Sequence, residues 1–123
     1  MQIHQSAEDY LETILMLTQR MGRVRSIDVV NELGYTKASV SIAMKKLREN
    51  GYIAVDGEGN LTLLEPGREI AERIYSRHRL LTHFFVQLGV DEEVAAEDAC
   101  KAEHILSEQT LEKIREYALL HDA

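Results

Sequence analysis

The segment that most constrains the fold is a pair of short helical patterns separated by a glycine. Ser26 is a suitable N-cap for a short helix that ends at Gly34, and Thr36 opens a second helix that runs to about Asn50. Apolar residues recur at helical spacing, and those predicted to face inward are Ile27, Val30, Leu33, Val40, Met44 and Leu47. Two short helices joined by a tight glycine-containing turn predict a helix-turn-helix motif.

The outer face of the second helix carries side chains suited to contact with a nucleic acid. They are small, hydroxylated or basic: small side chains let a helix enter the major groove, and hydroxyls and amines bond to phosphates and base edges. The residues predicted to contact double-stranded DNA are Arg25, Ser26, Thr36, Lys37, Ala38, Ser39, Ser41 and Lys45.

A β-hairpin pattern follows directly after this helix. Residues 52–55 and 61–64 are rich in strand-forming residues, and Asp56-Gly57-Glu58-Gly59-Asn60 lies between them. A hairpin in this place is a wing, so the pattern predicts a winged helix-turn-helix domain over residues 6–64. The acidic tip, with Asp56 and Glu58, is unusual for a DNA-binding wing. We expect it either to pack against the protein or to stay away from the phosphates.

The charge distribution supports this interpretation, although the net charge of −7 argues at first against nucleic acid. Residues 20–48 hold seven basic and two acidic residues, a local charge of +5, whereas residues 65–123 hold seven basic and thirteen acidic ones, a local charge of −6. A phosphate backbone responds to the local patch more than to the total. A basic face that is merely solvated remains the alternative.

Helical patterns dominate the rest of the chain, so the predicted fold class is mainly α with a small β-hairpin. Ser6 is expected to cap a helix over residues 6–20, Pro66 to begin a long helix that ends at Gly89, and Asp91 and Ser107 to cap two more. The predicted inward residues are Ala7, Tyr10, Leu11, Ile14 and Leu17, then Ile70, Ile74, Leu81, Phe84 and Leu88, then Leu111, Ile114 and Ala118.

This pattern divides the chain into a DNA-binding domain at residues 1–64 and a helical domain at residues 65–123. The last two helices are amphipathic and have little else to cover them, which predicts a homodimer. A two-fold dimer of such modules fits a palindromic DNA site.

The sequence shows no sign of export or membrane insertion. No apolar run approaches the length of a bilayer span, and the N-terminus lacks a signal pattern. A single cysteine, Cys100, cannot form an internal disulfide, which agrees with a reducing compartment. We therefore expect a cytoplasmic protein with no membrane partner.

The segment from Asp98 to His104 suggests a metal site. If it is helical, Cys100, Glu103 and His104 share one face at i, i+3 and i+4, and their thiol, carboxylate and imidazole all bind divalent transition metals. The alternative is an ordinary solvated Glu and His beside a small core cysteine. Asp9 and Glu12 of the first helix are also candidates. Their alternative explanation is structural, because acidic side chains are favourable near the positive end of the helix dipole.

Four segments together resemble one known family, the metal-dependent repressors of the diphtheria-toxin-repressor and manganese-transport-regulator type. The similarity runs from Ser6 to about Leu120, and its carriers are Glu8-Asp9-Tyr10-Leu11-Glu12, Ser39-Val40-Ser41, Arg77-His78-Arg79-Leu80-Leu81 and Glu97-Asp98-Ala99-Cys100-Lys101-Ala102-Glu103-His104. The resemblance implies a metal-activated, DNA-binding transcriptional repressor that controls metal-ion uptake, rather than an enzyme.

The resemblance also implies the metal ligands. Asp9 matches a manganese-type ligand where iron-type members carry Met, whereas Cys100 matches iron-type members, so the chain is a hybrid. One ion is implied at Asp9, Glu103, His104 and Cys100, the last through its sulfur or its backbone carbonyl. A second ion is implied at Glu12 and His78, with Glu103 as a bridging carboxylate.

These donors point to Mn²⁺ or Fe²⁺ as the cofactor, with Zn²⁺ or Co²⁺ possible in vitro. The iron-type ancillary site looks incomplete because Ala96 and Thr82 fall where its extra His and Glu are expected. The chain also stops before the SH3-like domain of longer members, which favours the short, manganese-type architecture. The alternatives are a metal-independent winged-helix regulator and a small metallohydrolase. The hydrolase lacks a separate general base, an oxyanion donor or a substrate loop in this sequence.

Overall fold

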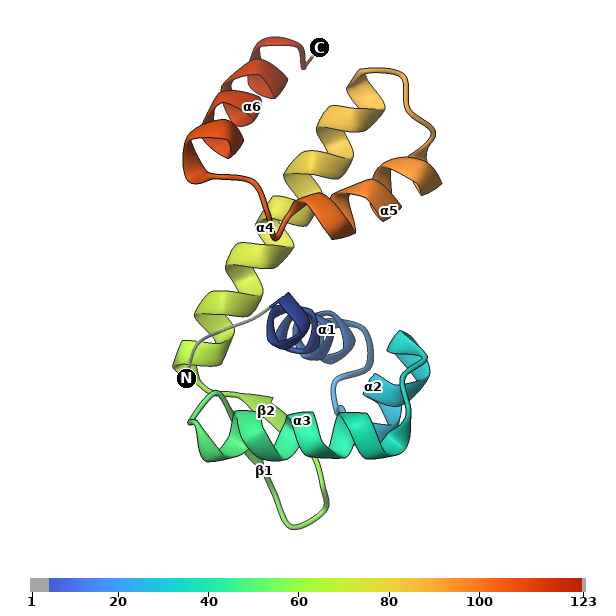
Figure 1. Ribbon diagram of the computed structural model, residues 1–123, viewed down its shortest axis with the longest axis vertical. Coiled ribbons are helices and arrows are strands. Elements are labelled where there is room, and N and C mark those ends of the chain that lie inside the picture. The colour runs from blue at the N-terminus through green and yellow to red at the C-terminus, as the bar shows by residue number, and fades with distance from the viewer. Residues whose placement is uncertain (1–4, 123) are drawn as a thin grey trace. The chain divides into compact units, whose positions relative to one another are not determined.

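The computed structural model describes residues 5–122, and in that range it contains six helices and one antiparallel hairpin (Figure 1). The elements are α1 (Gln5–Met21), α2 (Ser26–Leu33), α3 (Lys37–Glu49), β1 (Ile53–Val55), β2 (Leu61–Leu63), α4 (Glu65–Gln87), α5 (Glu92–Ala102) and α6 (Glu108–Leu120). This confirms the predicted mainly α fold class.

The chain divides into two compact units between Glu72 and Arg73, inside α4. We describe them separately as the first unit, up to Glu72, and the second unit, from Arg73. The predicted domain boundary after residue 64 stays a prediction. Residues 1–4 and 123, at the outer ends of the predicted domains, lie outside the described residues.

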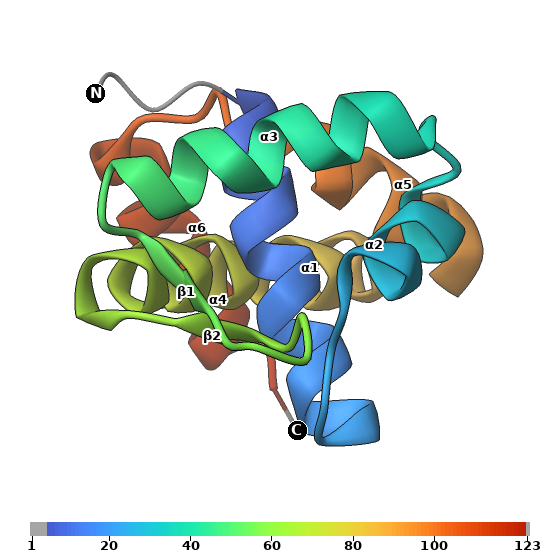
Figure 2. The same ribbon diagram turned by 90° about the horizontal axis from the view of Figure 1, so that it is seen from below.

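The first unit is a helix-turn-helix with a wing. Helix α1 contacts α2 and β2, while α3 contacts α2 and β1, as Figure 2 shows from below. The strands pair in antiparallel register, with Ile53 opposite Leu63 and Val55 opposite Leu61. All five predicted inward residues of α1 are buried, as are Val40, Met44 and Leu47 of α3. Helical periodicity therefore predicted the core faces of both helices correctly.

The turn between α2 and α3 is also as predicted. Gly34 adopts the left-handed conformation, with φ of 72°, and ends α2. Thr36 caps α3, because its hydroxyl oxygen accepts a hydrogen bond from the Ser39 N–H at 3.1 Å. This cap satisfies a backbone donor that has no partner within the helix.

Three predictions about helix starts and faces in this unit were wrong. Ser6 lies inside α1, which already includes Gln5. Residue Arg25, not Ser26, is the N-cap of α2, because the Arg25 N–H donates to the Asp28 carboxylate at 2.9 Å. The inward residue of α2 is Val29, fully buried, whereas Ile27 is exposed. In a helix of only two turns, the apolar spacing leaves the direction of the inner face ambiguous.

The second unit packs three helices around a small apolar cluster. Leu81 of α4, Ala99 of α5 and Leu111 of α6 are buried together, and Figure 1 shows α5 and α6 flanking the C-terminal half of α4. Ser107 caps α6 as predicted, accepting from the Thr110 N–H at 3.2 Å. Leu88 was wrongly placed on the inner stripe: α4 ends at Gln87, and Leu88 is exposed in the following turn.

The segment carrying the suspected metal ligands is helical only in part. Helix α5 ends at Ala102, Glu103 is its C-cap, and His104 lies in the turn that follows. Glu103 keeps helical dihedral angles and its N–H donates to the Ala99 carbonyl at 2.9 Å, so it still continues the helical turn. The strict helical spacing predicted for His104 was therefore wrong.

Among residues 5–122, no helix combines the length and the apolar composition that a membrane span requires.

A close backbone approach joins the wing to the start of α4. The Tyr52 carbonyl accepts from the Leu64 N–H at 3.0 Å, and a β-carbon added to Gly67 would lie 2.2 Å from that same oxygen. The Leu11 side chain is 3.3 Å from the added atom on another side. Only glycine fits between them without a backbone shift.

We therefore expect Gly67→Ala to lower the free energy of unfolding of the metal-free protein by about 2 kcal/mol, the range of an overpacked core position. The measurement is urea unfolding followed by far-UV circular dichroism at fixed protein concentration. Gly57→Ala is the control, because Gly57 has nothing within 4 Å of an added β-carbon and its φ is not in the left-handed region. Equal midpoints for the two variants would contradict the expectation.

Candidate functional site

A fully buried carboxylate lies at the end of α5. The Glu103 side chain has no solvent-exposed surface, and its backbone N–H donates to the carbonyl of Ala99, a member of the apolar cluster. Removing a carboxylate from water is costly unless charged or hydrogen-bonding groups replace the water. The groups around Glu103 therefore indicate what this position is built for.

The His78 imidazole provides part of that replacement through a hydrogen bond, and the His104 imidazole lies close by without hydrogen-bonding to the carboxylate. His78 Nδ1 lies 2.9 Å from Glu103 Oε2, and His104 Nε2 lies 3.5 Å from Glu103 Oε1. The His104 side chain is 2 % exposed and that of His78 is 23 % exposed. We call these three residues the Glu103 cluster. Its burial contradicts the alternative in which Glu103 and His104 lie on a solvated helix face.

The chemistry of the Glu103 cluster fits a divalent transition metal. One carboxylate and two imidazoles are donors that suit Mn²⁺, Fe²⁺ and Zn²⁺. The three residues come from α4, the C-cap of α5 and the turn after it, so the packing of the second unit brings them together.

Cys100 is exposed, three residues before Glu103 on α5. The alternative of a small core cysteine was therefore wrong. Its role as a ligand, through sulfur or carbonyl, stays a prediction.

The two predicted ligands of α1 belong to the first unit. Asp9 is half-buried, and Glu12 is buried at 6 % exposure. The helix-dipole explanation requires only an exposed acid near the start of the helix, so it does not account for the burial of Glu12. Tyr10 lies between Asp9 and Glu12 in the sequence. The pKa of its phenol is raised above 10.0, first by burial, then by Tyr35 and then by the Asp9 carboxylate. The inclusion of Asp9 and Glu12 in one site with the Glu103 cluster stays a prediction.

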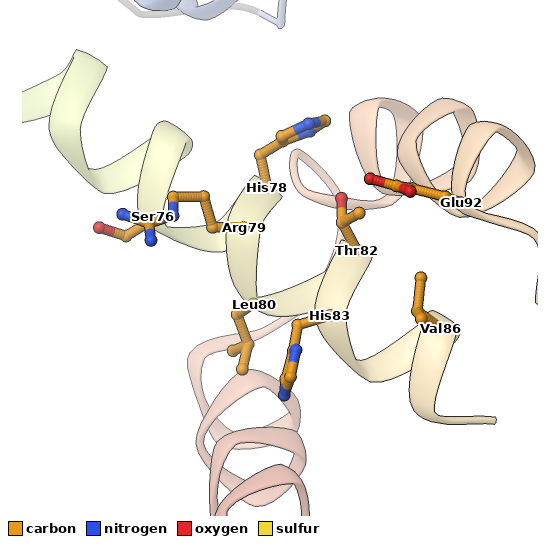
Figure 3. Close-up of a pocket in the computed structure, with 8 residues that line it drawn as sticks. All are labelled: Ser76, His78, Arg79, Leu80, Thr82, His83, Val86 and Glu92. Atoms are coloured by element: carbon orange, nitrogen blue, oxygen red, sulfur yellow. The ribbon is translucent and has the colours of Figure 1, made fainter. Parts of the chain in front are cut away.

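A surface depression of about 730 Å³ opens on α4 beside the Glu103 cluster. In Figure 3, His78 and Thr82 project from one side of α4, and Leu80 and His83 from the other. Thr82 contributes a hydroxyl where an ancillary metal site would need a carboxylate. Glu92 brings a carboxylate to the same depression, so the incompleteness of the ancillary site stays a prediction.

The predicted DNA-contacting residues lie on the surface of the first unit. All are exposed except Ser26, which is half-buried. The Thr36 hydroxyl donates to the Ser39 hydroxyl at 2.9 Å while it caps α3, so these two groups also organise the start of the helix. Their contact with DNA stays a prediction.

Arg25 has a structural partner in the wing. Its Nε donates to the Glu58 carbonyl at 2.9 Å, its second guanidinium nitrogen contacts the same oxygen, and its backbone bridges to Asn60. At the tip, Asp56 Oδ1 accepts from the N–H groups of Glu58 and Asn60, each at 2.9 Å. These contacts order the tip and hold its backbone against Arg25, but the Asp56 and Glu58 side chains are exposed, so neither explanation for the acidic tip is decided by them.

Sequence reasoning missed two residues. Ile42 is 58 % exposed on α3, and its helical-wheel position between Ser39 and Lys45 was the available signal. An apolar side chain on a groove-facing surface can contact a thymine methyl group. Arg77, whose side chain contacts both Glu103 and Glu108, lies in a segment that carries the family resemblance, but nothing in the sequence indicated these contacts because they join distant parts of the chain.

Comparison with known families covers almost the whole chain. The description "Iron dependent repressor, N-terminal DNA binding domain" matches residues 2–61, and "Iron dependent repressor, metal binding and dimerisation domain" matches residues 64–119. The chain belongs to the iron-dependent repressor family. It is thus a metal-dependent transcriptional repressor with DNA-binding and dimerisation domains, and not an enzyme, as the resemblance implied. Its control of metal-ion uptake stays a prediction.

Similar proteins support this membership of the iron-dependent repressor family. An uncharacterized helix-turn-helix transcriptional regulator of Methanocaldococcus jannaschii is 36% identical over 113 residues, covering 90% of both chains. The regulator MntR of Bacillus subtilis is 35% identical over 109 residues, covering 89% of this chain and 77% of MntR. A manganese-dependent transcriptional repressor solved with manganese is 28% identical, with a TM-score of 0.83 over 91% of this chain. This chain spans about half of that solved chain, 52%.

The pH behaviour of the wing tip gives a test of its hydrogen bonds. The side-chain amide of Asn60, then its backbone N–H, hold the pKa of the Asp56 carboxyl below 3.8. A lowered folded-state pKa stabilises the wing above pH 3.8, and this contribution is lost as the pH falls through the folded-state value.

We expect Asn60→Ala to raise the Asp56 pKa toward 3.8, because one hydrogen bond to the ionised form is removed. The measurement is an NMR pH titration of the Asp56 carboxyl carbon. Asn31→Ala, in an exposed position of α2, is the control and should leave this titration unchanged. An unchanged Asp56 titration in Asn60→Ala would contradict the hydrogen bond from the Asn60 side chain.

Proposed function

We propose that this repressor acts in the cytoplasm, where Mn²⁺ or Fe²⁺ activates it, and that it controls metal-ion uptake. The observation that carries the proposal is the Glu103 cluster, a fully buried carboxylate within 2.9 Å of one imidazole nitrogen and 3.5 Å of another. Packing a carboxylate and two imidazoles together, away from water, favours a bound cation.

The ligand set proposed for the first ion is Asp9, Glu103, His104 and Cys100. For a second ion we propose Glu12 and His78, with Glu103 bridging. The burial of Glu12 in the first unit and of Glu103 in the second supports the inclusion of both carboxylates.

The donors and the relatives favour manganese, with iron next. Carboxylate and imidazole donors suit Mn²⁺ or Fe²⁺, whereas a thiolate would shift the preference toward Fe²⁺, Co²⁺ or Zn²⁺. The name MntR and the manganese-dependent repressor solved with manganese describe relatives of this chain. Asp9, which matches the manganese-type ligand, points the same way.

The mechanism rests on the clustering of acids. In the metal-free protein, Asp9, Glu12 and Glu103 repel one another and disfavour the arrangement that brings them together. When bound, a divalent ion supplies the positive charge that reverses this repulsion. Asp9 and Glu12 then hold α1 in the conformer whose α3 helices, in a two-fold dimer, match successive turns of the major groove. The coupling between metal and DNA is reciprocal, so DNA also tightens the metal.

The DNA contacts proposed on α3 are the exposed Lys37, Ala38, Ser41 and Lys45, to which we add Ile42. Thr36 and Ser39 are proposed to contact phosphate while they cap the helix, and Arg25 and Ser26 to do so at the start of α2. The target is a palindromic operator.

Glu103→Gln is the first test, because it keeps the side-chain size but removes the charge. We expect Mn²⁺ to tighten wild-type binding to a palindromic metal-transport promoter fragment by about 5- to 150-fold, the usual range of coupling between sites. The variant is expected to bind equally with Mn²⁺ and with chelator. The measurement is fluorescence anisotropy of labelled DNA at fixed salt, repeated with anaerobic Fe²⁺ and with Zn²⁺.

Glu93→Gln is the matched control, since Glu93 is exposed in the first turn of α5. It should keep the wild-type metal response. If wild-type protein and Glu103→Gln bind DNA equally in the presence of chelator and of Mn²⁺, the regulator is metal-independent.

Cys100→Ala decides how Cys100 takes part, because it removes the sulfur and keeps the backbone carbonyl. A sulfur ligand predicts that the variant loses the thiolate-to-metal charge-transfer absorption of the Co²⁺-loaded protein and binds Zn²⁺ more weakly. A carbonyl ligand predicts unchanged Co²⁺ spectra. The measurement is ultraviolet–visible absorption during Co²⁺ titration, and Mn²⁺ affinity should change little in either case.

A further inference from the structure

Arg77 is a largely buried cation next to the Glu103 cluster, and the proposed ligand set makes no use of it. Its side chain is 15 % exposed. One guanidinium nitrogen, Nη1, donates to the backbone carbonyl of Glu103 at 3.2 Å. The other, Nη2, forms an ion pair with the carboxylate of Glu108.

These two contacts join the end of one helix to the start of the next. Glu103 is the C-cap of α5, and Glu108 is the first residue of α6. Between them lies the turn of residues 103–107, which begins with Glu103 and His104. A planar guanidinium with donors in a fixed fork can hold two acceptors in one geometry, which a single ammonium cannot do.

The contact to the Glu103 carbonyl lies at the C-terminal end of α5. The last carbonyls of a helix have no partner within it, and an arginine can satisfy them. The Glu103 carbonyl belongs to the residue whose side chain lies between His78 and His104. Movement of this backbone therefore moves the carboxylate of the Glu103 cluster.

We propose that Arg77 is a positioning residue of the metal centre, which fixes the turn that presents Glu103 and His104 without binding the ion itself. This inference rests on the proposed function. A guanidinium stays protonated and has no lone pair to offer a cation, so it acts through Glu103. Groups that orient metal ligands typically change metal affinity by about 10- to 100-fold when removed.

Substitution of Glu108 distinguishes a positioning role of Arg77 from a general effect on stability. The Glu108 side chain is 78 % exposed, and exposed ion pairs contribute little to stability. If Glu108 orients the Arg77 guanidinium, Glu108→Ala should weaken metal binding while leaving the free energy of unfolding nearly unchanged. The effects of Arg77 and Glu108 substitutions on metal affinity should also be less than additive, because both act through one guanidinium.

The experiment measures Mn²⁺ affinity of the full chain by isothermal titration calorimetry for Arg77→Met, Arg77→Lys, Glu108→Ala and the Arg77→Met/Glu108→Ala pair. We expect Arg77→Met to weaken Mn²⁺ binding by about tenfold or more. Arg77→Lys should recover only part of this, because lysine is a point charge. The Co²⁺ absorption spectrum of Arg77→Met should differ from wild type, which a uniformly destabilised protein would not show.

Arg115→Met and Glu112→Ala are the matched controls, since both residues are exposed on α6. They should keep wild-type affinity. Unfolding of each metal-free variant shows whether it is folded at the titration temperature. If Arg77→Met does not fold, Glu108→Ala and Arg77→Lys carry the test.

Two results overturn the proposal. Wild-type Mn²⁺ affinity in Arg77→Met or, if that variant is unfolded, in both Glu108→Ala and Arg77→Lys would show that Arg77 has no positioning role. Failure of the wild-type protein to bind Mn²⁺, Fe²⁺ or Zn²⁺ would refute the proposed function itself, and this inference with it. Weakened binding in the Arg77 variants beside normal wild-type binding supports both.

Discussion

The burial of the Glu103 carboxylate is the constraint on which the second unit depends. A carboxylate without water requires partners. His78 of α4 supplies a hydrogen bond, and His104, in the turn after α5, places an imidazole nitrogen 3.5 Å from the other carboxylate oxygen. The apolar cluster of Leu81, Ala99 and Leu111 fixes the three helices that bring these groups together. Packing and chemistry are therefore coupled: the same helix contacts that bury the leucines also assemble the polar cluster.

Much of the fold was predictable because its signals are local. Gly34 ends a helix through its own backbone conformation, and Thr36 and Ser107 cap helices with hydroxyls that reach only three residues ahead. The predictions for Ser26 and Ile27 failed for a different reason. The N-cap at Arg25 depends on the Asp28 carboxylate, and two turns of helix carry too little periodicity to fix a face.

The site was predictable in its residue types but not in its environment. Cys100, Glu103 and His104 stand out by spacing, whereas His78 was recognised only through its resemblance to the family motif. The complete burial of Glu103, and its contact with Arg77 across 26 positions in the chain, follow from tertiary packing that a helical pattern does not contain. The exposure of Cys100 is of the same kind, because a lone cysteine is usually buried.

The attachment of the wing to the start of α2 has a consequence for self-association. The Leu61 N–H donates to the Val24 carbonyl at 2.7 Å, and Arg25 bridges to Asn60. The outer edge of β2 is therefore covered by the chain itself. An uncovered strand edge is a template for pairing with another molecule. Residues 24 and 25 thus occupy the positions on β2 that a strand of another molecule would need in order to pair there.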